Sequence, residues 1–215
     1  MNIGIIGSGN IGGTLAQLFS DAGHQVAISN SRGPQSLKDF EKYGTSGTGN
    51  GSNIKAMTIE ETIAFGDIIV LAIPWIKRQE LPPSDVFNGK IVIDAMNPYS
   101  ENFEVINLKP SSSSEEVAKQ LNGARIVKAF NTLYYQHLKT KGNTKLSKED
   151  RIVIFVAGDD PQAKSIVSKL IDEIGFAPVD TGSLSEGGRK QQPGSVVYNN
   201  PMTLQVAHKK LSEIS

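Results

Sequence analysis

The sequence predicts an α/β protein with a doubly wound, mostly parallel sheet. Short apolar runs of strand length alternate with helical patterns along the chain, and several of these runs are apolar without a break. A glycine-rich turn also joins the first apolar run to the first helical pattern. Unbroken apolar runs are typical of parallel strands that are covered on both faces, and their alternation with helices produces a doubly wound sheet.

The first strand, turn and helix carry a phosphate-binding motif. Residues 2–6 form the predicted strand, and apolar residues three or four apart predict a helix from Ile11 onward. The turn between them has the pattern Gly-x-Gly-x-x-Gly at Gly7, Gly9 and Gly12. In this motif the first glycine permits a tight turn, the second lets the backbone approach a pyrophosphate, and the third lets the helix pack closely on the strand. The segment therefore predicts a Rossmann-type dinucleotide site, with free N–H groups of the helix facing the phosphates.

The end of the second strand predicts which dinucleotide is bound. Residues 25–29 form this strand, and an NAD-specific site would place an acidic residue after it to bind the ribose 2′-hydroxyl. The chain instead has Ser31 and Arg32 there. A guanidinium group binds phosphate through paired hydrogen bonds, and a serine hydroxyl can add another. Pro34 then predicts the start of a further helix, whose N-terminus faces the same phosphate. These residues predict NADP(H) as the cofactor.

The remaining strands follow in order along the chain. They are predicted at residues 54–57, 67–73, 90–94, 125–130 and 151–157, with a short edge strand at residues 177–180. Ligands of such sheets bind outside the carboxyl ends of the strands, so the turns after the strands matter most. Those turns cover residues 7–11, 29–32, 72–75, 95–98 and 129–132.

The remaining helices are predicted from their apolar spacing and their capping residues. They cover residues 35–43, 59–64, 115–121 and 161–174, and a last helix starts at Asn200 and Pro201. A capping box is predicted at the start of the third of these helices. Either Ser112 and Glu115 or Ser113 and Glu116 can form it. Residues 44–53 are rich in glycine, serine and threonine, and we expect a mobile loop there.

Length and charge restrict the organisation and the partners. A chain of 215 residues suits a single domain spanning residues 1–215, with residues 176–215 as a small C-terminal extension. The 22 basic and 22 acidic residues balance, so we expect no nucleic acid or membrane surface as a partner.

Residue usage also excludes some chemistry. The absence of cysteine excludes disulfides, thiol catalysis and cysteine metal sites, and the 3 histidines lack metal-ligand spacing, so no metal site is expected. No segment has the roughly 20 uninterrupted apolar residues that span a bilayer, and glycines interrupt the apolar N-terminus. We therefore expect a soluble cytoplasmic protein.

Six segments together resemble one family: residues 7–12, 30–34, 71–75, 94–98, 128–132 and 158–160. The chain resembles, over nearly its whole length, the NADPH-dependent deazaflavin reductases, which pass hydride between NADP and coenzyme F420, and related dinucleotide-binding oxidoreductases. It is also similar to the cytoplasmic NADPH domain of the six-transmembrane metalloreductases, in which a flavin takes the hydride. The resemblance implies an NADP-dependent oxidoreductase with a flavin-like partner.

The resemblance also implies roles for single residues. The pyrophosphate would be bound by Ser8, Gly9, Asn10 and Ile11, the 2′-phosphate by Ser31 and Arg32, and the nicotinamide region would be lined by Ile73, Pro74, Ala129 and Asn131. A polar group that follows the Ser-Arg pair in the family has two candidates here, Ser36 and Lys38. Residues 97–99 depart from the deazaflavin-specific pattern, which leaves F420, FMN and FAD open as the hydride partner.

Hydride transfer between two bound rings predicts no catalytic side chain, because the cofactors carry the chemistry. Tyr135 and Lys139 match the dyad of short-chain dehydrogenases, but the glycine spacing of that family differs. We expect transfer between NADP(H) and a small-molecule flavin or deazaflavin acceptor. Two alternatives stay open, a non-catalytic NADPH-binding or sensing module and a dehydrogenase of a small imine or hydroxy acid. The direction of transfer and the pairing of two chains in a homodimer also stay open.

Overall fold

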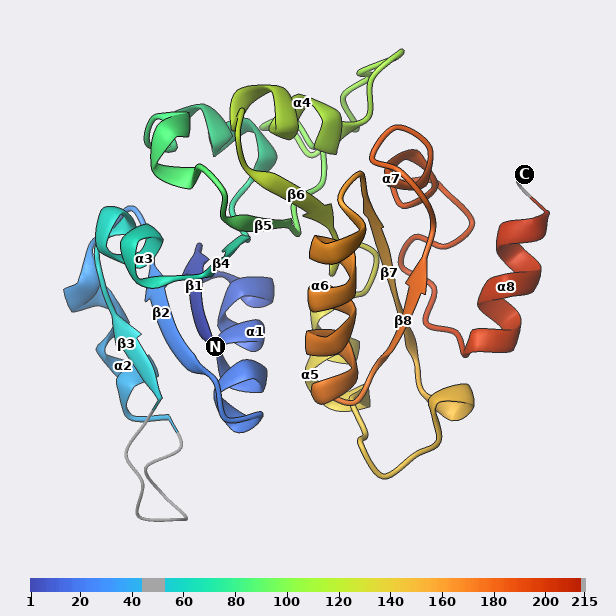
Figure 1. Cartoon of the computed structure of the whole chain (residues 1–215), viewed down its shortest axis with the longest axis horizontal. Coiled ribbons are helices and arrows are strands. Elements are labelled where there is room, and N and C mark those ends of the chain that lie inside the picture. Colours follow the sequence, from blue (N-terminus) through green and yellow to red (C-terminus); the bar gives the residue numbers. More distant parts are fainter. Residues whose placement is uncertain (44–52, 214–215) are drawn as a thin grey trace.

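A computed structural model describes residues 1–43 and 53–213 of the chain (Figure 1). Within these residues, 8 strands form one sheet in the order β3-β2-β1-β4-β5-β6-β7-β8. The strands are β1 (Asn2–Ile6), β2 (Gln25–Ser29), β3 (Ile54–Ala56), β4 (Ile68–Leu71), β5 (Ile91–Asp94), β6 (Arg125–Lys128), β7 (Val153–Gly158) and β8 (Ala177–Asp180). The strands from β1 to β6 are parallel, whereas β7 runs antiparallel to β6 and β8 runs parallel to β7. The predicted doubly wound, mostly parallel Rossmann-type sheet is confirmed.

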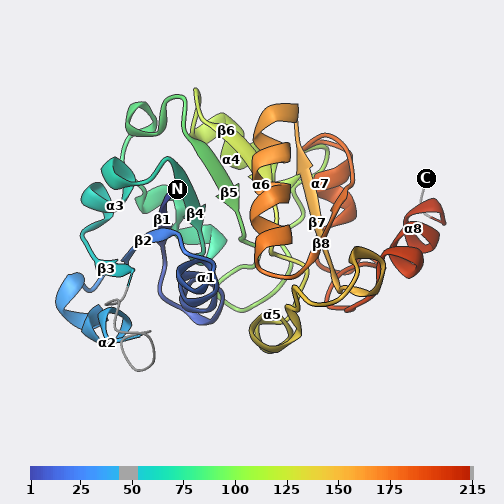
Figure 2. The ribbon, with the colours of Figure 1, turned by 60° about the horizontal axis from the view of Figure 1, so that its bottom comes forward.

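Helices cover both faces of this sheet. They are α1 (Asn10–Asp21), α2 (Lys38–Glu41), α3 (Ile59–Phe65), α4 (Ser113–Gln120), α5 (Tyr135–Lys141), α6 (Pro161–Glu173), α7 (Gly187–Lys190) and α8 (Leu204–Ser212). Short 3-10 helices span Pro34–Leu37, Trp75–Glu80, Ser84–Phe87 and Lys148–Asp150. Neighbouring residues of β1 show the layering, because Ile5 packs in a core with α1, α5 and α6, and Ile6 packs in a core with α3 and α4. Figure 2 shows α1 and α5 beneath the sheet.

The strand order reverses between β1 and β4. From β1 the chain adds β2 and β3 on one side, then crosses over to β4 and continues to β8 on the other side (Figure 1). In open parallel sheets this reversal leaves a crevice at the carboxyl ends of the strands, where ligands bind. The turns after β1, β2, β4, β5 and β6 all lie at that edge of the sheet, as the sequence predicts.

Local capping explains where two of the helices begin. Asp160 Oδ1 accepts hydrogen bonds from the backbone N–H groups of Gln162 and Ala163, which starts α6 as predicted. At the start of α4, the capping box joins Ser112 and Glu115, the first of the two predicted pairings.

The prediction for the last helix is wrong at its start. α8 begins at Leu204 rather than at Asn200, because the preceding residues pair with the sheet. Val153 N donates to Met202 O over 2.9 Å, and Thr203 forms an isolated bridge with Ile152. The segment predicted as one helix at residues 35–43 is a 3-10 helix followed by the short α2. The sequence patterns do not predict α5 or the 3-10 helix Trp75–Glu80.

The C-terminal part of the chain adds the outer strand of the sheet. β8 lies beside β7, and α8 packs against both through a small core that includes Phe155, Val179 and Ala207. The division into one domain with an extension at residues 176–215 stays a prediction. The predicted loop at residues 44–53 lies outside the described residues, apart from Asn53. The apolar spacing that predicts the last helix also includes Ile214, which lies outside the described residues as well.

Candidate functional site

The turn after β1 has space only for glycine at two positions. Gly7 has φ +109°, and a Cβ atom there would lie 2.3 Å from Ala72 O. A Cβ atom on Gly12 would lie 1.9 Å from Gly7 O, so α1 approaches the strand only because this residue is glycine. Gly9 differs, since a Cβ atom there would meet no atom within 4 Å. The backbone at Gly9 therefore faces open space that a ligand can enter.

The start of α1 offers backbone donors to that space. Gly9 is the N-cap residue, and no side chain caps the helix. The first N–H groups of a helix have no partner within the helix, and together with the helix dipole they favour an anion. The geometry of the glycine turn therefore suits a phosphate group, as its sequence predicts.

Asn30 ties the glycine turn to the loop after β2. Its Nδ2 atom donates to Ser8 Oγ and to Ser36 Oγ, each over 3.0 Å. Its Oδ1 atom accepts from the backbone N–H of Arg32 over 2.9 Å. The amide thus fixes the two loops relative to each other. Asn30 belongs to the motif recognised in the sequence but was not predicted as a site residue.

A cavity of about 400 Å³, which we name the Arg32 cavity, lies between these loops and the turn after β4. It is lined by the predicted residues Gly7, Ser8, Gly9, Ser31, Arg32, Ile73 and Pro74, and by Ile6, Asn30, Ile59, Ala72, Lys77, Glu80 and Leu81. The Arg32 guanidinium has no hydrogen-bond or ion-pair partner among the described residues. Lys77 Nζ lies 2.7 Å from Glu80 Oε1. The cavity therefore presents a cation that is available to a phosphate.

A second cavity, of about 510 Å³, lies on the other side of the glycine turn and is named here the tyrosine cavity. It is lined by Asn10, Ile11, Ala95, Asn97, Tyr99, Phe103, Phe130, Asn131, Thr132, Leu133, Tyr134, Tyr135, Tyr198 and Asn199. Ser8 and Gly9 line the Arg32 cavity, whereas the next two residues line the tyrosine cavity. One turn therefore borders both cavities, which suits an elongated ligand with phosphates at its middle.

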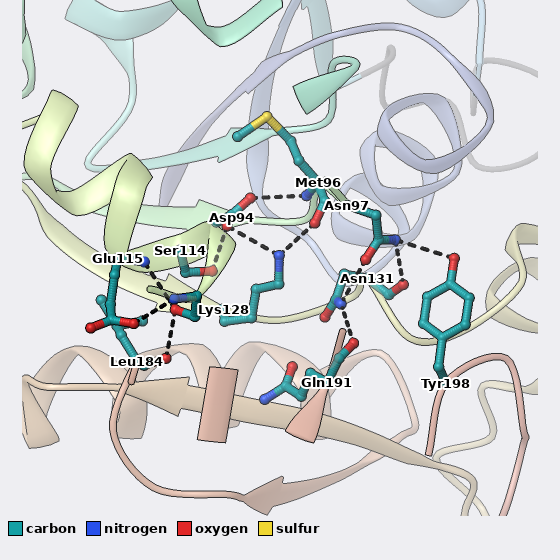
Figure 3. A network of polar contacts seen from close by, with 11 residues as sticks. Asp94, Met96, Asn97, Ser114, Glu115, Lys128, Asn131, Leu184, Gln191 and Tyr198 are labelled. Carbon is teal, nitrogen blue, oxygen red and sulfur yellow. Dashed lines mark hydrogen bonds and ion pairs between the residues drawn. The ribbon is translucent and has the colours of Figure 1, made fainter. Parts of the chain in front are cut away.

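Hydrogen bonds organise the wall of the tyrosine cavity (Figure 3). Asn131 Nδ2 donates to Asn97 Oδ1 over 3.0 Å and to Gln191 O over 2.8 Å. Asn97 Nδ2 donates to Asn131 O over 2.9 Å and to the Tyr198 hydroxyl over 3.4 Å. Asn131 is only 5% exposed, and its buried Oδ1 atom has no partner among the described residues. Buried acceptors in proteins normally have a partner, so a bound water, an ion or a ligand would complete this one.

A buried ion pair supports the turn that carries Asn97. Lys128 Nζ contacts Asp94 Oδ2 and donates to Met96 O, and Asp94 Oδ2 also accepts from Ser114 Oγ over 2.6 Å (Figure 3). Burial lowers the pKa of Lys128, and the Asp94 carboxylate opposes that effect. The pair joins the ends of β5 and β6 directly behind the cavity wall.

Backbone strain marks the turn after β6. Phe130 has φ +65°, in the left-handed region that non-glycine residues adopt at a cost of about 1–3 kcal/mol. Its ring is buried and packs edge-on against Phe19 of α1, at 6.1 Å between centroids. The packing holds the turn that presents Asn131.

The structure separates the predicted site residues into groups. Asn10, Ile11 and Asn131 line the tyrosine cavity. Ile73 and Pro74, which the family resemblance assigns to the nicotinamide region, line the Arg32 cavity. Two predicted residues line neither cavity, since the side chain of Ala129 is packed in the core and Lys38 is exposed at the start of α2.

Several lining residues were not predicted as site residues. Asn97 and Tyr99 follow β5, so their place after a strand was a signal. Lys77 lies on a 3-10 helix that no local pattern predicted. Tyr198 comes from the segment after β8, which carries no motif, and only the fold brings it to the site. The same segment supplies Gln191, which lines neither cavity but whose carbonyl accepts from Asn131.

Across residues 1–43 and 53–213, His, Asp and Glu side chains form no group of three or more that could hold a metal ion. None of the helices in that part of the chain is both long and apolar enough to span a membrane.

Comparison with known proteins finds a family that the N-terminal part of the chain resembles. The family model described as "NADP oxidoreductase coenzyme F420-dependent" matches residues 2–98, which include the glycine turn and the lining of the Arg32 cavity. This part of the chain is similar to that family. Over nearly its whole length, the chain is also similar to the solved structure of hypothetical protein SMa0349 from Sinorhizobium meliloti. The two are 32% identical with a TM-score of 0.79, over 94% of this chain and 95% of that chain.

Two further similarities are more distant. A structure provisionally described as an F420-dependent NADP-reductase from Arthrobacter sp. fb24 is 20% identical, with a TM-score of 0.68 over 94% of this chain and 98% of that chain. Metalloreductase STEAP3 of Rattus norvegicus is 26% identical over 185 residues, which is 85% of this chain and 34% of STEAP3. The chain thus spans about a third of the length of the curated relatives that it matches.

Proposed function

We propose that the chain transfers hydride between NADP(H) and a flavin or deazaflavin acceptor. The observation that carries this proposal is the position of the glycine turn between two cavities of different chemistry. The Arg32 cavity is cationic and suits the phosphorylated adenosine half of NADP, whereas the tyrosine cavity is aromatic and suits the nicotinamide together with a second ring. When bound, NADPH supplies the hydride, and the chain supplies the site that holds both rings.

The residues of the Arg32 cavity fit the phosphates of NADP. The open space at Gly9 and the uncapped start of α1 would receive the pyrophosphate. Ser31 and the guanidinium of Arg32, which has no partner among the described residues, would bind the 2′-phosphate, and Asn30 holds their loop in place. Lys77 lines the same cavity as a further cation, already paired with Glu80.

The residues beyond the glycine turn fit the other half of the cofactor. The Oδ1 atom of Asn131, which has no partner within the described part of the chain, would accept a hydrogen bond from the carboxamide of the nicotinamide. Ile11 and the aromatic side chains of the cavity exclude water and orient the two rings. Hydride transfer requires reacting carbon atoms about 3–3.5 Å apart, so orientation is the main contribution that the chain makes.

The proposal is tested by mixing the purified protein with NADPH and, separately, riboflavin, FMN, FAD and coenzyme F420, and following NADPH oxidation. We expect oxidation that depends on the acceptor and saturates with it. Tight NADPH binding without oxidation by any acceptor would contradict the proposal and would favour a binding or sensing module. A cytoplasmic location and the pairing of two chains stay predictions.

A further inference from the structure

The two cavities differ sharply in charge. Arg32, Lys77 and Glu80 line the first, whereas none of the described residues that line the tyrosine cavity is Lys, Arg, His, Asp or Glu. A bound phosphate normally requires Arg, Lys or a helix N-terminus. Arg32 and Lys77 face the Arg32 cavity, whereas the tyrosine cavity is bordered only by the backbone starts of α1 and of the short α5. An acceptor in the tyrosine cavity therefore meets no charged side-chain partner for a phosphate among the described lining residues.

The hairpin at the mouth of the tyrosine cavity carries negative charges next to Phe103 in the sequence. Phe103 lies at this mouth, where it lines the cavity while its side chain stays 85% exposed. A hairpin holds it there, with Ser100 N donating to Glu104 O over 2.8 Å and Tyr99 bridged to Val105. Glu101 and Glu104 stand on either side of Phe103 in the sequence of this hairpin, and both are exposed. Acidic groups at the entrance disfavour an acceptor that carries an anionic tail.

Aromatic side chains provide the apolar surface of this cavity. Tyr134 is 45% exposed, and its ring packs edge-on against Tyr135 with centroids 4.7 Å apart. Aromatic faces bind a planar ring by stacking, without any need for charge. The nearest cationic side chain on α5 is Lys139, one helical turn after Tyr135, and it does not line the cavity.

A tyrosine pair adds one directional hydrogen-bond donor. The hydroxyl oxygens of Tyr99 and Tyr198 lie 3.2 Å apart, and Tyr198 also accepts from Asn97. One hydrogen bond between two hydroxyls uses one of their two protons, so the other proton is free for a ligand. Burial, and then the hydrogen bond with Tyr99, raises the pKa of Tyr198, which keeps its hydroxyl protonated. A carbonyl oxygen or ring nitrogen of an aromatic ligand is the complementary acceptor.

We infer that the tyrosine cavity binds the hydride acceptor as an uncharged planar ring with a carbonyl edge, such as riboflavin or a quinone, and gives no advantage to a phosphate on that acceptor. The inference rests on the proposed function and names its substrate class. For a quinone, hydride from NADPH and one proton from solvent give the hydroquinone and NADP⁺. Two electrons leave the nicotinamide and enter the acceptor ring, so the reaction balances without another reactant.

The test compares kcat/KM for riboflavin, FMN, coenzyme F420 and menadione at low and high salt, with NADPH saturating. We expect riboflavin and menadione to match or exceed FMN and F420, with little dependence on salt. A preference of about tenfold or more for FMN or F420 that shrinks at high salt and is lost in Lys139→Ala would overturn this inference and leave the proposed function standing. Menadione turnover without flavin turnover would support the inference and correct the proposed acceptor.

A binding measurement keeps the inference testable if no acceptor is reduced. Quenching of riboflavin fluorescence in the NADP-bound protein reports the cavity without turnover, and equal or tighter binding of riboflavin than of FMN is expected. Tyr198→Phe should raise the Kd for riboflavin about tenfold, the effect of about one hydrogen bond, and change the Kd for NADPH much less. Tyr43→Phe is the matched control, because that hydroxyl contacts Asp21 outside both cavities. Tighter binding of FMN than of riboflavin, or equal effects of the two variants, would contradict the inference.

Discussion

The Nζ atom of Lys128 lies 3.1 Å from Oδ2 of Asp94, and both side chains are completely buried. The two residues are register partners on neighbouring strands, β5 and β6, at the edge of the sheet where both cavities open. Their hydrogen bonds to Met96 fix the backbone between Asp94 and Asn97. A charge pair inside the sheet therefore supports the wall of the tyrosine cavity.

Replacing Lys128 with Met should destabilise the protein strongly. The substitution leaves the carboxylate of Asp94 buried without its countercharge, which typically costs about 3–5 kcal/mol. Denaturant unfolding measures this cost. Lys119→Met is the control, because its ion pair with Glu116 is on the surface and contributes less than about 1 kcal/mol. Equal losses in both variants would show that the buried pair is not special.

Arg32→Ala should weaken NADPH binding and leave NADH binding nearly unchanged. A charge-assisted hydrogen bond contributes about 1.5–3 kcal/mol, so a loss of about tenfold or more in NADPH affinity is expected. Titration calorimetry with both cofactors measures the difference. Lys38→Ala provides the comparison, since Lys38 is exposed and lies outside the lining of the Arg32 cavity. A loss in this second variant as large as in the first would instead place Lys38 at the 2′-phosphate.

Alanine at two glycines of the turn should separate folding from binding. At Gly12 the new Cβ atom would collide with Gly7 O, so Gly12→Ala should destabilise the fold by about 1–3 kcal/mol or more. At Gly9 the Cβ atom meets nothing, so stability should fall by less than about 1 kcal/mol while NADPH affinity falls about tenfold. Thermal unfolding and NADPH titration of both variants distinguish the effects. Unchanged NADPH affinity in Gly9→Ala would contradict the proposed phosphate site.

The ion pair at the start of α6 should make stability depend on acidic pH. Hydrogen bonds from Arg125, and then from the backbone N–H of Ala163, lower the pKa of Asp160 from 3.8 to about 2. A carboxylate with a depressed pKa in the folded state stabilises the fold above its unfolded value, and this contribution is lost as the pH falls from about 4 towards 2. Asp160→Asn retains a helix cap but should show a smaller loss of stability across that pH range. Parallel pH profiles of the melting temperature in the two proteins would contradict the assignment.

The fold and half of the site could be predicted because their signals are local. Strand runs, the glycine turn and the pair Ser31 and Arg32 each lie within a few residues, and parallel strands bring their carboxyl ends to one edge. The contact between Asn97 and Tyr198 joins residues 101 apart, and no local pattern encodes it. A lysine in a strand also gives no sign that it is buried, so the role of Lys128 emerges only from the packing.

The position of the glycine turn between the cavities has a consequence for how new specificities arise. The lining of the Arg32 cavity lies within residues 2–98, whereas the tyrosine cavity takes much of its wall from later segments, including residues 130–135 and Tyr198. Apart from Asn131, the proposed partner of the nicotinamide, substitutions in those later segments change the surroundings of the acceptor and leave the proposed phosphate contacts of the coenzyme intact. The chain can therefore retain its source of reducing power while its reaction partner diverges.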